Sequence, residues 1–264
     1  LATKEQAVSI PAREAGCLLS NMAPDWLVEH KLQELNAHRR MIPLAYVNTS
    51  AAVKAACARY GGSVCTSANA GTMLQWALDQ GDGVVFLPDK NLARNTAKAV
   101  GIPEKEWSML DLRSRESRPR GQFCIWPGLC VVHSIIKPRH IRTIRREDPK
   151  ALIIVHPECP PEVVDMADAS GSTSRIIRYV QEAKPGAVIY VGTEINMVQR
   201  LAREVAPDKI VRPVLDTACS NMAKVTVHNL ADHVQGIQSE PPVQVAEDIQ
   251  RDALCALERM LHVC

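Results

Sequence analysis

Aromatic residues are scarce in this chain, and long apolar segments are absent. Phe, Trp and Tyr together make up 4% of the 264 residues, so aliphatic side chains and methionine must build the core. No run of about 18 apolar residues occurs, and a membrane-spanning helix is therefore not expected. The first residues, Leu1–Gln6, include neither a starting methionine nor the apolar centre of a signal peptide. These features predict a soluble, cytoplasmic protein without a membrane partner.

An excess of charge of one sign is absent too. The chain has 31 Lys and Arg residues against 29 Asp and Glu residues, a net charge of +2 with histidine neutral. Nothing in this balance indicates nucleic acid as the main partner. The hydrophobic share of 46% is sufficient for a full core, and the length allows more than one domain.

Cysteine is abundant, but it forms no CxxC pattern that would indicate zinc or ferredoxin-type binding. The nine cysteines are odd in number and lie in a long chain, which argues against the disulfide scaffold of a small secreted domain. Cys17, Cys130 and Cys219 each lie in a predicted loop at the end of an apolar run. Three thiolates meeting on one iron–sulfur cluster would leave one iron free to act as a Lewis acid. Buried structural thiols are the alternative that spacing alone leaves open.

The other cysteines are interpreted differently. Cys65 and Cys159 could bind metal on chemistry alone, although structural thiols are the better interpretation. A free cysteine packs like a small apolar residue. The remaining four are therefore treated as packing residues: Cys57, Cys124, Cys255 and Cys264.

Short apolar runs alternate with helical patterns along most of the chain. The predicted strands cover residues 44–47, 63–66, 83–88, 123–126, 151–155, 187–191 and 209–213. The predicted helices cover residues 50–59, 71–78, 91–100, 138–147, 161–169, 173–183, 195–205 and 245–264. This alternation is typical of parallel βαβ units with helices on both faces of the sheet. The unit runs twice, over residues 40–122 and 123–217. The segment Lys105–Gly121 interrupts this pattern near the end of the first unit; it is charged, has no apolar period, and is predicted to be an exposed insertion.

Two polar residues follow the predicted strand 151–155 at its carboxyl end, where open parallel sheets bind their ligands. They are His156 and Glu158, separated by a proline that favours an extended turn. A histidine can shuttle protons near neutral pH, and a glutamate can remove an α-proton or bind an imine nitrogen. A loop histidine bonded to the backbone is the alternative interpretation.

Hydroxyl and amide groups stand at other strand ends. Ser172 and Thr173 open a predicted helix, where free N–H groups can bind a carboxylate or a phosphate, although ordinary helix caps use the same residues. Tyr46, Asn48 and Ser67 end two earlier strands and could bind carboxylates or hydroxyls, although Asn and Ser are also frequent in turns. Weaker candidates are Thr193-Glu194, and His133 near Cys130; Asp89-Lys90 is interpreted as a structural helix start.

Six strings in this order resemble the quinolinate synthase family. They are YVNTSAAVKA from Tyr46, CTSANA from Cys65, FLPDKNLA from Phe86, WPGLCVVH from Trp126, HPECP from His156 and GSTS from Gly171. The resemblance implies three similar αβα domains around a pseudo-threefold axis, with a [4Fe–4S] cluster at their junction. It also implies condensation of iminoaspartate with dihydroxyacetone phosphate to quinolinate, a precursor of NAD. L-aspartate oxidase is the implied supplier of iminoaspartate.

The resemblance assigns roles to individual residues. It implies one cluster ligand from each domain: Cys17, Cys130 and Cys219. It implies catalytic roles for His156, Glu158 and Tyr46. The implied substrate-binding residues are Tyr46, Asn48, Ser67, His156, Glu158, Ser172 and Thr173.

One departure from the family pattern shapes the expected domain organisation. Residues 1–39 resemble only the end of the family's first domain and the linker that follows, and its His-Tyr-Tyr-type motif has no counterpart here. We therefore expect a truncated protein with little or no activity. Residues 218–264 are expected to hold a cluster-ligand loop and helices that pack on the first domain, which would leave the apolar side of the last helix exposed.

Two other classes of protein stay open from the sequence. One is a non-catalytic α/β protein that keeps the family's surface and binds only a ligand or a partner. The other is a different iron–sulfur enzyme, such as a hydro-lyase, which also uses a cluster with one open iron.

Overall fold

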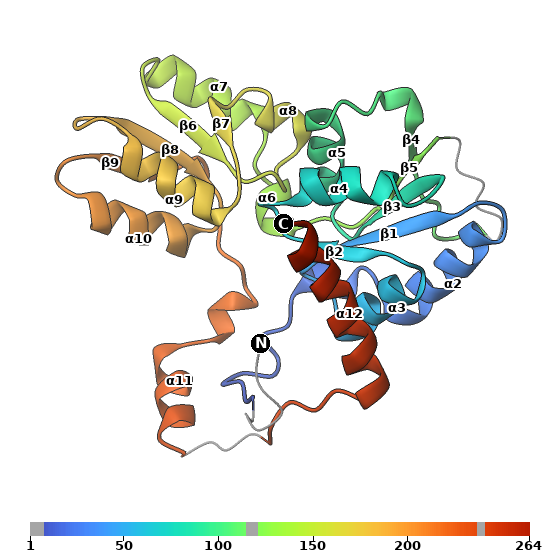
Figure 1. Ribbon diagram of the computed structural model, residues 1–264. Coiled ribbons are helices and arrows are strands. Elements are labelled where there is room, and N and C mark those ends of the chain that lie inside the picture. Colours follow the sequence, from blue (N-terminus) through green and yellow to red (C-terminus); the bar gives the residue numbers. More distant parts are fainter. Residues whose placement is uncertain (1–7, 115–120, 237–240) are drawn as a thin grey trace.

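The computed structural model describes residues 8–114, 121–236 and 241–264, which form an α/β protein with two parallel sheets (Figure 1). The first sheet has the strand order β2-β1-β3-β5-β4, and the second has the order β7-β6-β8-β9. The strands are β1 Met41–Tyr46, β2 Ser63–Cys65, β3 Gly83–Leu87, β4 Trp107–Met109, β5 Phe123–Ile125, β6 Leu152–Val155, β7 Ala169–Ser170, β8 Val188–Gly192 and β9 Ile210–Pro213. All their pairings are parallel, so the predicted α/β fold class is confirmed.

Helices cover both faces of the first sheet. They are α2 Asp25–Asn36, α3 Ala51–Arg59, α4 Ala70–Leu78 and α5 Lys90–Ala99. Successive side chains of a strand point to opposite faces, and β1 follows this rule. Ile42 and Leu44 pack in the core beneath α4 and α5, whereas Met41 and Ala45 pack beneath α2 and α3. Every residue of β1 is buried, as expected for a central strand covered on both sides.

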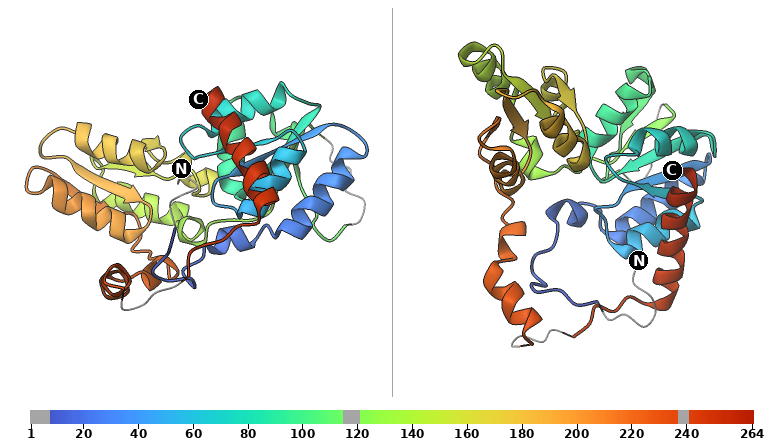
Figure 2. Two further views of the ribbon diagram at one scale, coloured as in Figure 1. Left: turned by 60° about the horizontal axis from the view of Figure 1, so that its bottom comes forward. Right: turned by 60° about the vertical axis from the view of Figure 1, so that its left-hand side comes forward.

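The second sheet is covered in the same way. Its helices are α7 Pro138–Glu147, α8 Pro161–Val164, α9 Thr173–Glu182 and α10 Ile195–Val205. Ile153 and Val155 of β6 pack on the α7 and α8 side, and Ile154 packs on the α9 and α10 side. Figure 2 shows the two sheets side by side.

The two sheets share one connection pattern. In each, the first strand of the unit lies between the second and the third, and the last lies beyond the third. Thus β1, β2, β3 and β5 correspond to β6, β7, β8 and β9, and β4 is an additional edge strand. This correspondence sets equivalent positions at the carboxyl ends of the two sheets.

Several elements differ from the sequence interpretation. The strand β5, assigned from the pattern to the unit 123–217, pairs with β3 in the first sheet. The predicted helix 161–169 is a single turn, α8, followed by β7. Part of the predicted exposed insertion is ordered as a one-turn 3-10 helix, η1 Glu104–Glu106, and the strand β4, while residues 115–120 lie outside the described residues. The remaining elements are α1 Leu18–Asn21, α6 Val131–Ser134, η2 Met222–Lys224, α11 Val227–Val234 and α12 Glu247–Val263.

The last helix, α12, is not left without a covering surface, and the expectation of an exposed apolar side is wrong for its centre. It lies along α3 and β2, with Ala256 fully buried there and Ala253 also buried (Figure 1). The Ser63 hydroxyl donates to the Ala256 carbonyl at 2.9 Å. Other apolar residues of this helix are exposed, with Leu254 at 41% and Leu261 at 62%.

The helix α11 has a different environment. It has no buried residue, and it stands apart from both sheets (Figure 2). Ser9 contacts His233 of this helix through a 2.8 Å hydrogen bond. Over the described parts of the chain, no helix has the length and apolar character needed to cross a bilayer.

Candidate active site at the carboxyl ends of the strands

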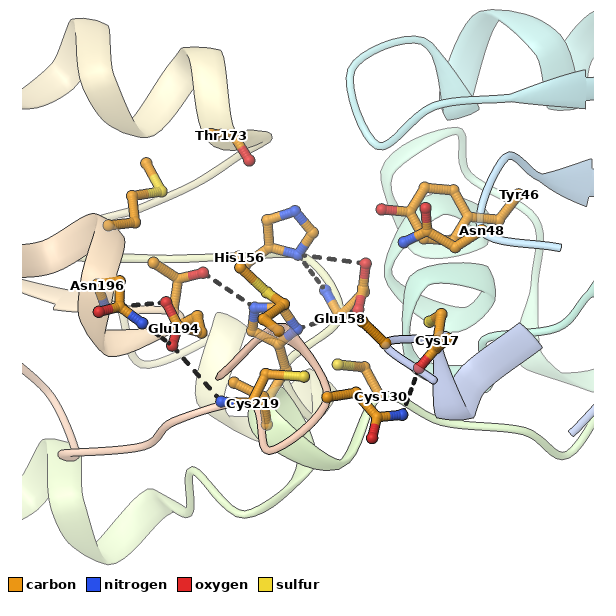
Figure 3. Close-up of a pocket in the computed structure, with 18 of the residues that line it drawn as sticks. Cys17, Tyr46, Asn48, Cys130, His156, Glu158, Thr173, Glu194, Asn196 and Cys219 are labelled. Carbon is orange, nitrogen blue, oxygen red and sulfur yellow. Dashed lines mark hydrogen bonds and ion pairs between the residues drawn. The ribbon is translucent and has the colours of Figure 1, made fainter. Parts of the chain in front are cut away.

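A cavity of about 570 Å³ opens where the carboxyl ends of the two sheets meet the segments that carry Cys17 and Cys219 (Figure 3). It brings together most of the residues that the sequence singles out. These are Cys17, Tyr46, Asn48, Cys130, His156, Glu158, Thr173 and Cys219. Ser67 and Ser172 do not line it. They line a neighbouring cavity of about 410 Å³ together with Arg175 and Arg178.

The strand ends explain why these side chains converge. Tyr46 is the last residue of β1, and His156 directly follows the equivalent strand β6. Cys130 comes shortly after β5, and Cys219 shortly after β9. Because the carboxyl ends of parallel strands share one edge, residues far apart in the sequence reach one place.

Hydrogen bonds lock the three cysteine-bearing segments to one another. The Trp126 indole N–H, in the Cys130 loop, donates to the Met22 carbonyl near Cys17 at 2.8 Å. The Asn221 side chain, close to Cys219, donates to the Gly16 carbonyl. These bonds tie the Cys17 segment to the Cys130 loop and to the Cys219 loop.

A tight approach of backbone also fixes the Cys130 loop. A β-carbon added to Gly128 would lie 2.5 Å from the Pro88 carbonyl oxygen, closer than two such atoms can come. The Lys90 N–H donates to the Gly128 carbonyl at 2.8 Å. Glycine is therefore required where this loop passes the end of β3.

The donor set fits an iron–sulfur cluster with three protein ligands. All nine cysteines are free thiols, and three of them line the cavity. Cys130 and Cys219 point toward each other in Figure 3. Among the described residues, the sulfurs of Cys17, Cys130 and Cys219 do not form a set within 4.8 Å, as one small ion would require. Thiolates are the usual protein ligands of iron–sulfur clusters, so the chemistry of the three lining thiols fits such a group.

The competing thiols lie elsewhere. Cys65 and Cys159 are fully buried and do not line the cavity. The Cys159 sulfur faces the Gly192 carbonyl at 3.7 Å. Their placement therefore agrees with a structural role.

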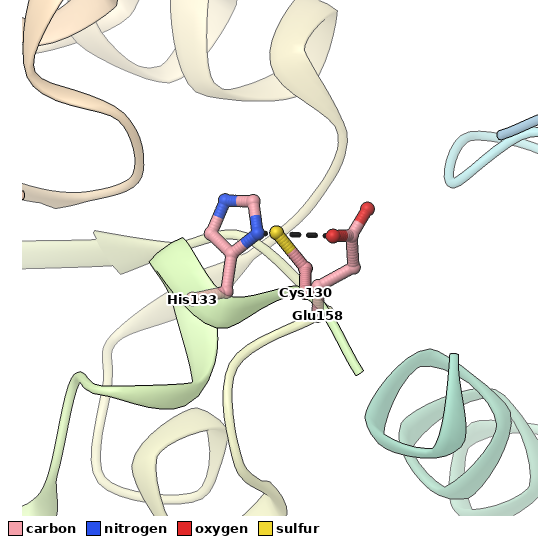
Figure 4. A group of neighbouring side chains, drawn as sticks. All are labelled: Cys130, His133 and Glu158. Carbon is pink, nitrogen blue, oxygen red and sulfur yellow. Dashed lines mark hydrogen bonds and ion pairs between the residues drawn. The ribbon is translucent and has the colours of Figure 1, made fainter. Parts of the chain in front are cut away.

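His133 ties Glu158 into a buried network (Figure 4). Its Nδ1 donates to Glu158 Oε2 at 3.0 Å, and its Nε2 lies 3.0 Å from the Thr193 hydroxyl. The ring of His156 stacks on it, with centroids 4.5 Å apart and planes 16° from parallel. The structure thus gives His133 a defined role beside the predicted pair.

The Cys130 sulfur completes a group with His133 and Glu158 whose ligand atoms lie within 4.8 Å of one another. Such a group could hold a single metal ion. Both ring nitrogens of His133 already have partners, however, and a metal would have to break one of these bonds. We interpret the group as a hydrogen-bond network.

The surroundings of the site shift the pKa values of its residues in different directions. Burial raises the pKa of Glu158, but the hydrogen bond from His133 and the neighbouring imidazoles outweigh burial and lower that pKa to about 2. Burial lowers the pKa of His156 to about 4. Burial, followed by the charge of Glu158, raises the pKa of Tyr46. At neutral pH the site therefore holds a carboxylate, a neutral His156 and a protonated phenol.

The thiol of Cys130 needs a cation to ionise. Burial and then the Glu158 carboxylate raise the pKa of Cys130 well above its ordinary value. A bound metal reverses this preference, because coordination removes the proton from a thiol.

Two asparagines of α5 hold the loop 157–159 from the side of the first sheet. The Asn91 amide donates to the Glu158 carbonyl at 3.0 Å. The Asn95 amide donates to the Pro157 and Cys159 carbonyls at 2.7 and 2.9 Å. The sequence interpretation does not name these residues, although their i, i+4 spacing on a predicted helix marks them as one face.

The helix α10 supplies further lining residues that the sequence interpretation does not name. Asn196 and Arg200 stand four residues apart near its start and face the cavity with Met197. Thr193 and Glu194, weaker candidates from the sequence, line it as well.

Comparison with known proteins identifies the family. The family model described as "Quinolinate synthetase A protein" matches residues 1–262. The chain belongs to the quinolinate synthase family. It is 37% identical to the quinolinate synthase of Bacillus licheniformis over 275 residues, which cover 100% of this chain and 74% of that protein. It is 38% identical to the quinolinate synthase of Corynebacterium glutamicum, covering 100% of this chain and 70% of that protein.

An archaeal relative is similar to the same extent. The quinolinate synthase of Haloarcula marismortui is 37% identical over 273 residues, which cover 98% of this chain and 72% of that protein. The family predicted from the six strings is thus confirmed. The roles of the single site residues stay predictions.

Proposed function

We propose that this site is that of a quinolinate synthase, the enzyme class that condenses iminoaspartate with dihydroxyacetone phosphate. The observation that carries the proposal is the convergence of three free thiols and a buried His–Glu pair on one cavity. Membership of the quinolinate synthase family supports it. By the same resemblance, L-aspartate oxidase is the proposed supplier of the imine.

The proposed cofactor is a [4Fe–4S] cluster on Cys17, Cys130 and Cys219. When bound, such a cluster supplies one iron without a protein thiolate, which can polarise a substrate oxygen as a Lewis acid. The protein's own groups then supply positioning and proton transfer.

Glu158 is the proposed base. Its carboxylate is ionised at neutral pH, because the hydrogen bond from His133 keeps its pKa low. It is buried at the edge of the cavity, where it can reach a bound substrate. Tyr46 stays protonated, because burial and the charge of Glu158 raise its pKa, and its hydroxyl is therefore suited to orient a substrate oxygen.

His156 has a complementary part. Its imidazole is neutral at pH 7, and its ring is held by stacking on His133. A neutral ring offers one donor and one acceptor nitrogen, so it can bind a substrate hydroxyl and pass on a proton.

Anionic groups of the substrates have partners nearby. Arg200, Asn48 and Thr173 line the main cavity, and Thr173 lies at the start of α9, where helix N–H groups favour anions. Ser67 and Ser172 line the neighbouring cavity beside two arginines. We propose these groups as binding sites for the carboxylates and the phosphate.

Ligand binding to the anaerobically reconstituted chain tests the proposal. Quinolinate should bind to the cluster-loaded chain more tightly than phthalate, which has the same two carboxylates but no ring nitrogen. The His156→Ala variant should weaken quinolinate binding, and Glu147→Gln, an exposed change on α7, should not. Equal binding of both diacids by loaded and cluster-free chain would contradict the proposal and favour a protein that only binds ligands.

A further inference from the structure

Two buried carboxylates occupy equivalent places in the two sheets. Asp89 is the second residue after β3, and Glu194 is the second residue after the corresponding strand β8. Each is the N-cap of the helix that follows, α5 or α10. Asp89 is 0% exposed and Glu194 is 7% exposed.

Each carboxylate accepts a backbone N–H of its own helix with one oxygen and the backbone N–H of a cysteine with the other. Asp89 Oδ1 accepts the Leu92 N–H at 2.7 Å, and Oδ2 accepts the Cys130 N–H at 2.8 Å. Glu194 Oε2 accepts the Asn196 N–H at 2.8 Å. Its Oε1 accepts from the Asn196 side chain at 2.8 Å and from the Cys219 N–H at 3.5 Å (Figure 3).

Capping alone does not account for these residues. The helices α3 and α9 are capped by Ser50 and Ser172, each accepting one N–H with a single oxygen. A buried carboxylate is costlier to desolvate than a hydroxyl. Within the described parts of the chain, neither Asp89 nor Glu194 forms an ion pair that would offset this cost. What the carboxylate adds is a second oxygen, and in both sheets that oxygen holds a cysteine.

We infer that Asp89 and Glu194 are positioning residues for two of the cluster cysteines. The inference rests on the proposed cluster site. Each carboxylate holds the amide of its cysteine against the start of a helix, so that the sulfur stays turned to the cavity. The Cys130 and Cys219 N–H groups are then occupied and do not donate to cluster sulfides.

This arrangement has a consequence for the cluster. Hydrogen bonds from backbone N–H groups to cluster sulfur raise the reduction potential, because they stabilise the more negative, reduced state. Because the Cys130 and Cys219 N–H groups donate to carboxylates instead, the reduction potential of the cluster is lowered. A cluster that stays oxidised suits a Lewis-acid role, which needs no electron transfer.

Isosteric variants separate this role from capping. In Asp89→Asn, the remaining oxygen can still cap α5, since asparagine is a good cap, but an NH₂ group faces the Cys130 N–H. Glu194→Gln makes the same change at Cys219. Ser50→Ala is the matched control, because it removes a helix cap that touches neither cysteine loop.

Hydrogen exchange on the cluster-free chain is the first measurement. In Asp89→Asn, peptides that contain the Cys130 amide should exchange about tenfold faster than in the parent, as expected for loss of a buried hydrogen bond. In Glu194→Gln, the Cys219 amide should show a smaller increase, because its bond is longer. Unchanged exchange at both amides would overturn the inference.

The reconstituted cluster gives the second measurement. Both variants should raise its midpoint potential, and iron loss to a chelator should be about tenfold faster, as for other groups that orient metal ligands. Ser50→Ala should match the parent. If the parent chain takes up the cluster but the variants leave its midpoint potential and chelation rate unchanged, the inference is overturned and the proposed function is not. A parent chain that takes up no cluster would overturn the proposed function and the inference with it.

Discussion

Glu158 and His156 lie close together but differ in charge at neutral pH. Glu158 accepts a hydrogen bond from His133 and keeps its charge, with a pKa lowered to about 2. His156 is equally buried, but the charge of Glu158 does not outweigh the effect of burial on its pKa. Burial therefore lowers the pKa of His156 to about 4. The sequence predicts this pair from its place after a strand. Its electrostatics depend on His133, which lies far away in the sequence and could not be paired with it from spacing.

The lowered pKa of His156 predicts how the free energy of unfolding depends on pH. Because the folded pKa of His156 is lowered from 6.5 to about 4, the unfolded chain binds more protons between these values. The free energy of unfolding should therefore fall as the pH is lowered from about 6.5 to 4, by up to about 3 kcal/mol. Urea unfolding of the cluster-free chain at several pH values measures this slope. His156→Asn should reduce it; an identical slope in that variant would show that other groups cause it.

Thiol reactivity provides a second prediction at this scale. Cys17 and Cys264 are exposed, whereas Cys57 and Cys65 are buried with raised pKa values. Alkylation followed by mass spectrometry should modify the first two quickly in the native chain and the second two only after unfolding. Loading with iron and sulfide should then protect Cys17 and leave Cys264 reactive. Protection of both or of neither by the cluster would contradict the ligand assignment.

The helix α5 connects the two sheets at the level of secondary structure. Its N-cap Asp89 holds the Cys130 amide, and its side chains Asn91 and Asn95 bond three carbonyls in the loop 157–159. Further along, Lys98 pairs with Asp165 at 2.5 Å, on an exposed surface. This helix thus supports both the loop that carries Cys130 and the loop 157–159.

The double variant Asn91→Ala, Asn95→Ala tests this support. It leaves buried carbonyls without donors, so the free energy of unfolding should drop by about 2–3 kcal/mol. Quinolinate binding should weaken as the His156–Glu158 loop loosens. Lys98→Ala on the same helix removes only an exposed ion pair and should change stability by less than about 1 kcal/mol. A comparable loss of stability in the double variant and in Lys98→Ala would argue against a specific role of Asn91 and Asn95 in holding this loop.

The elements that the sequence predicts well are those with enough residues to show a period. The helices at 138–147 and 195–205 match the structure residue for residue. The short elements β4 and β7 are missed, because two or three residues carry no periodic signal. The sheet to which β5 belongs is also misassigned, since strand pairing depends on contacts between distant segments.

At the scale of the whole molecule, the repeated strand order is what assembles the site. Equivalent strand ends supply Tyr46 and His156, Asp89 and Glu194, and Cys130 and Cys219. The sequence indicates the repeat and the three thiols, but their meeting at one cavity depends on how the two sheets lie together (Figure 2). Ser67 and Ser172, also equivalent, border a separate cavity at the same edge.

The iron and sulfide content of the chain after anaerobic reconstitution tests this account most directly. The parent chain should take up about four irons and four sulfides, as a cubane cluster requires. Serine substitution of Cys17, Cys130 or Cys219 should each abolish stable uptake, and Cys65→Ser, at a fully buried thiol outside the cavity, should retain it. A parent chain that binds a single metal ion, or a full cluster that persists without one of the three cavity thiols, would contradict it.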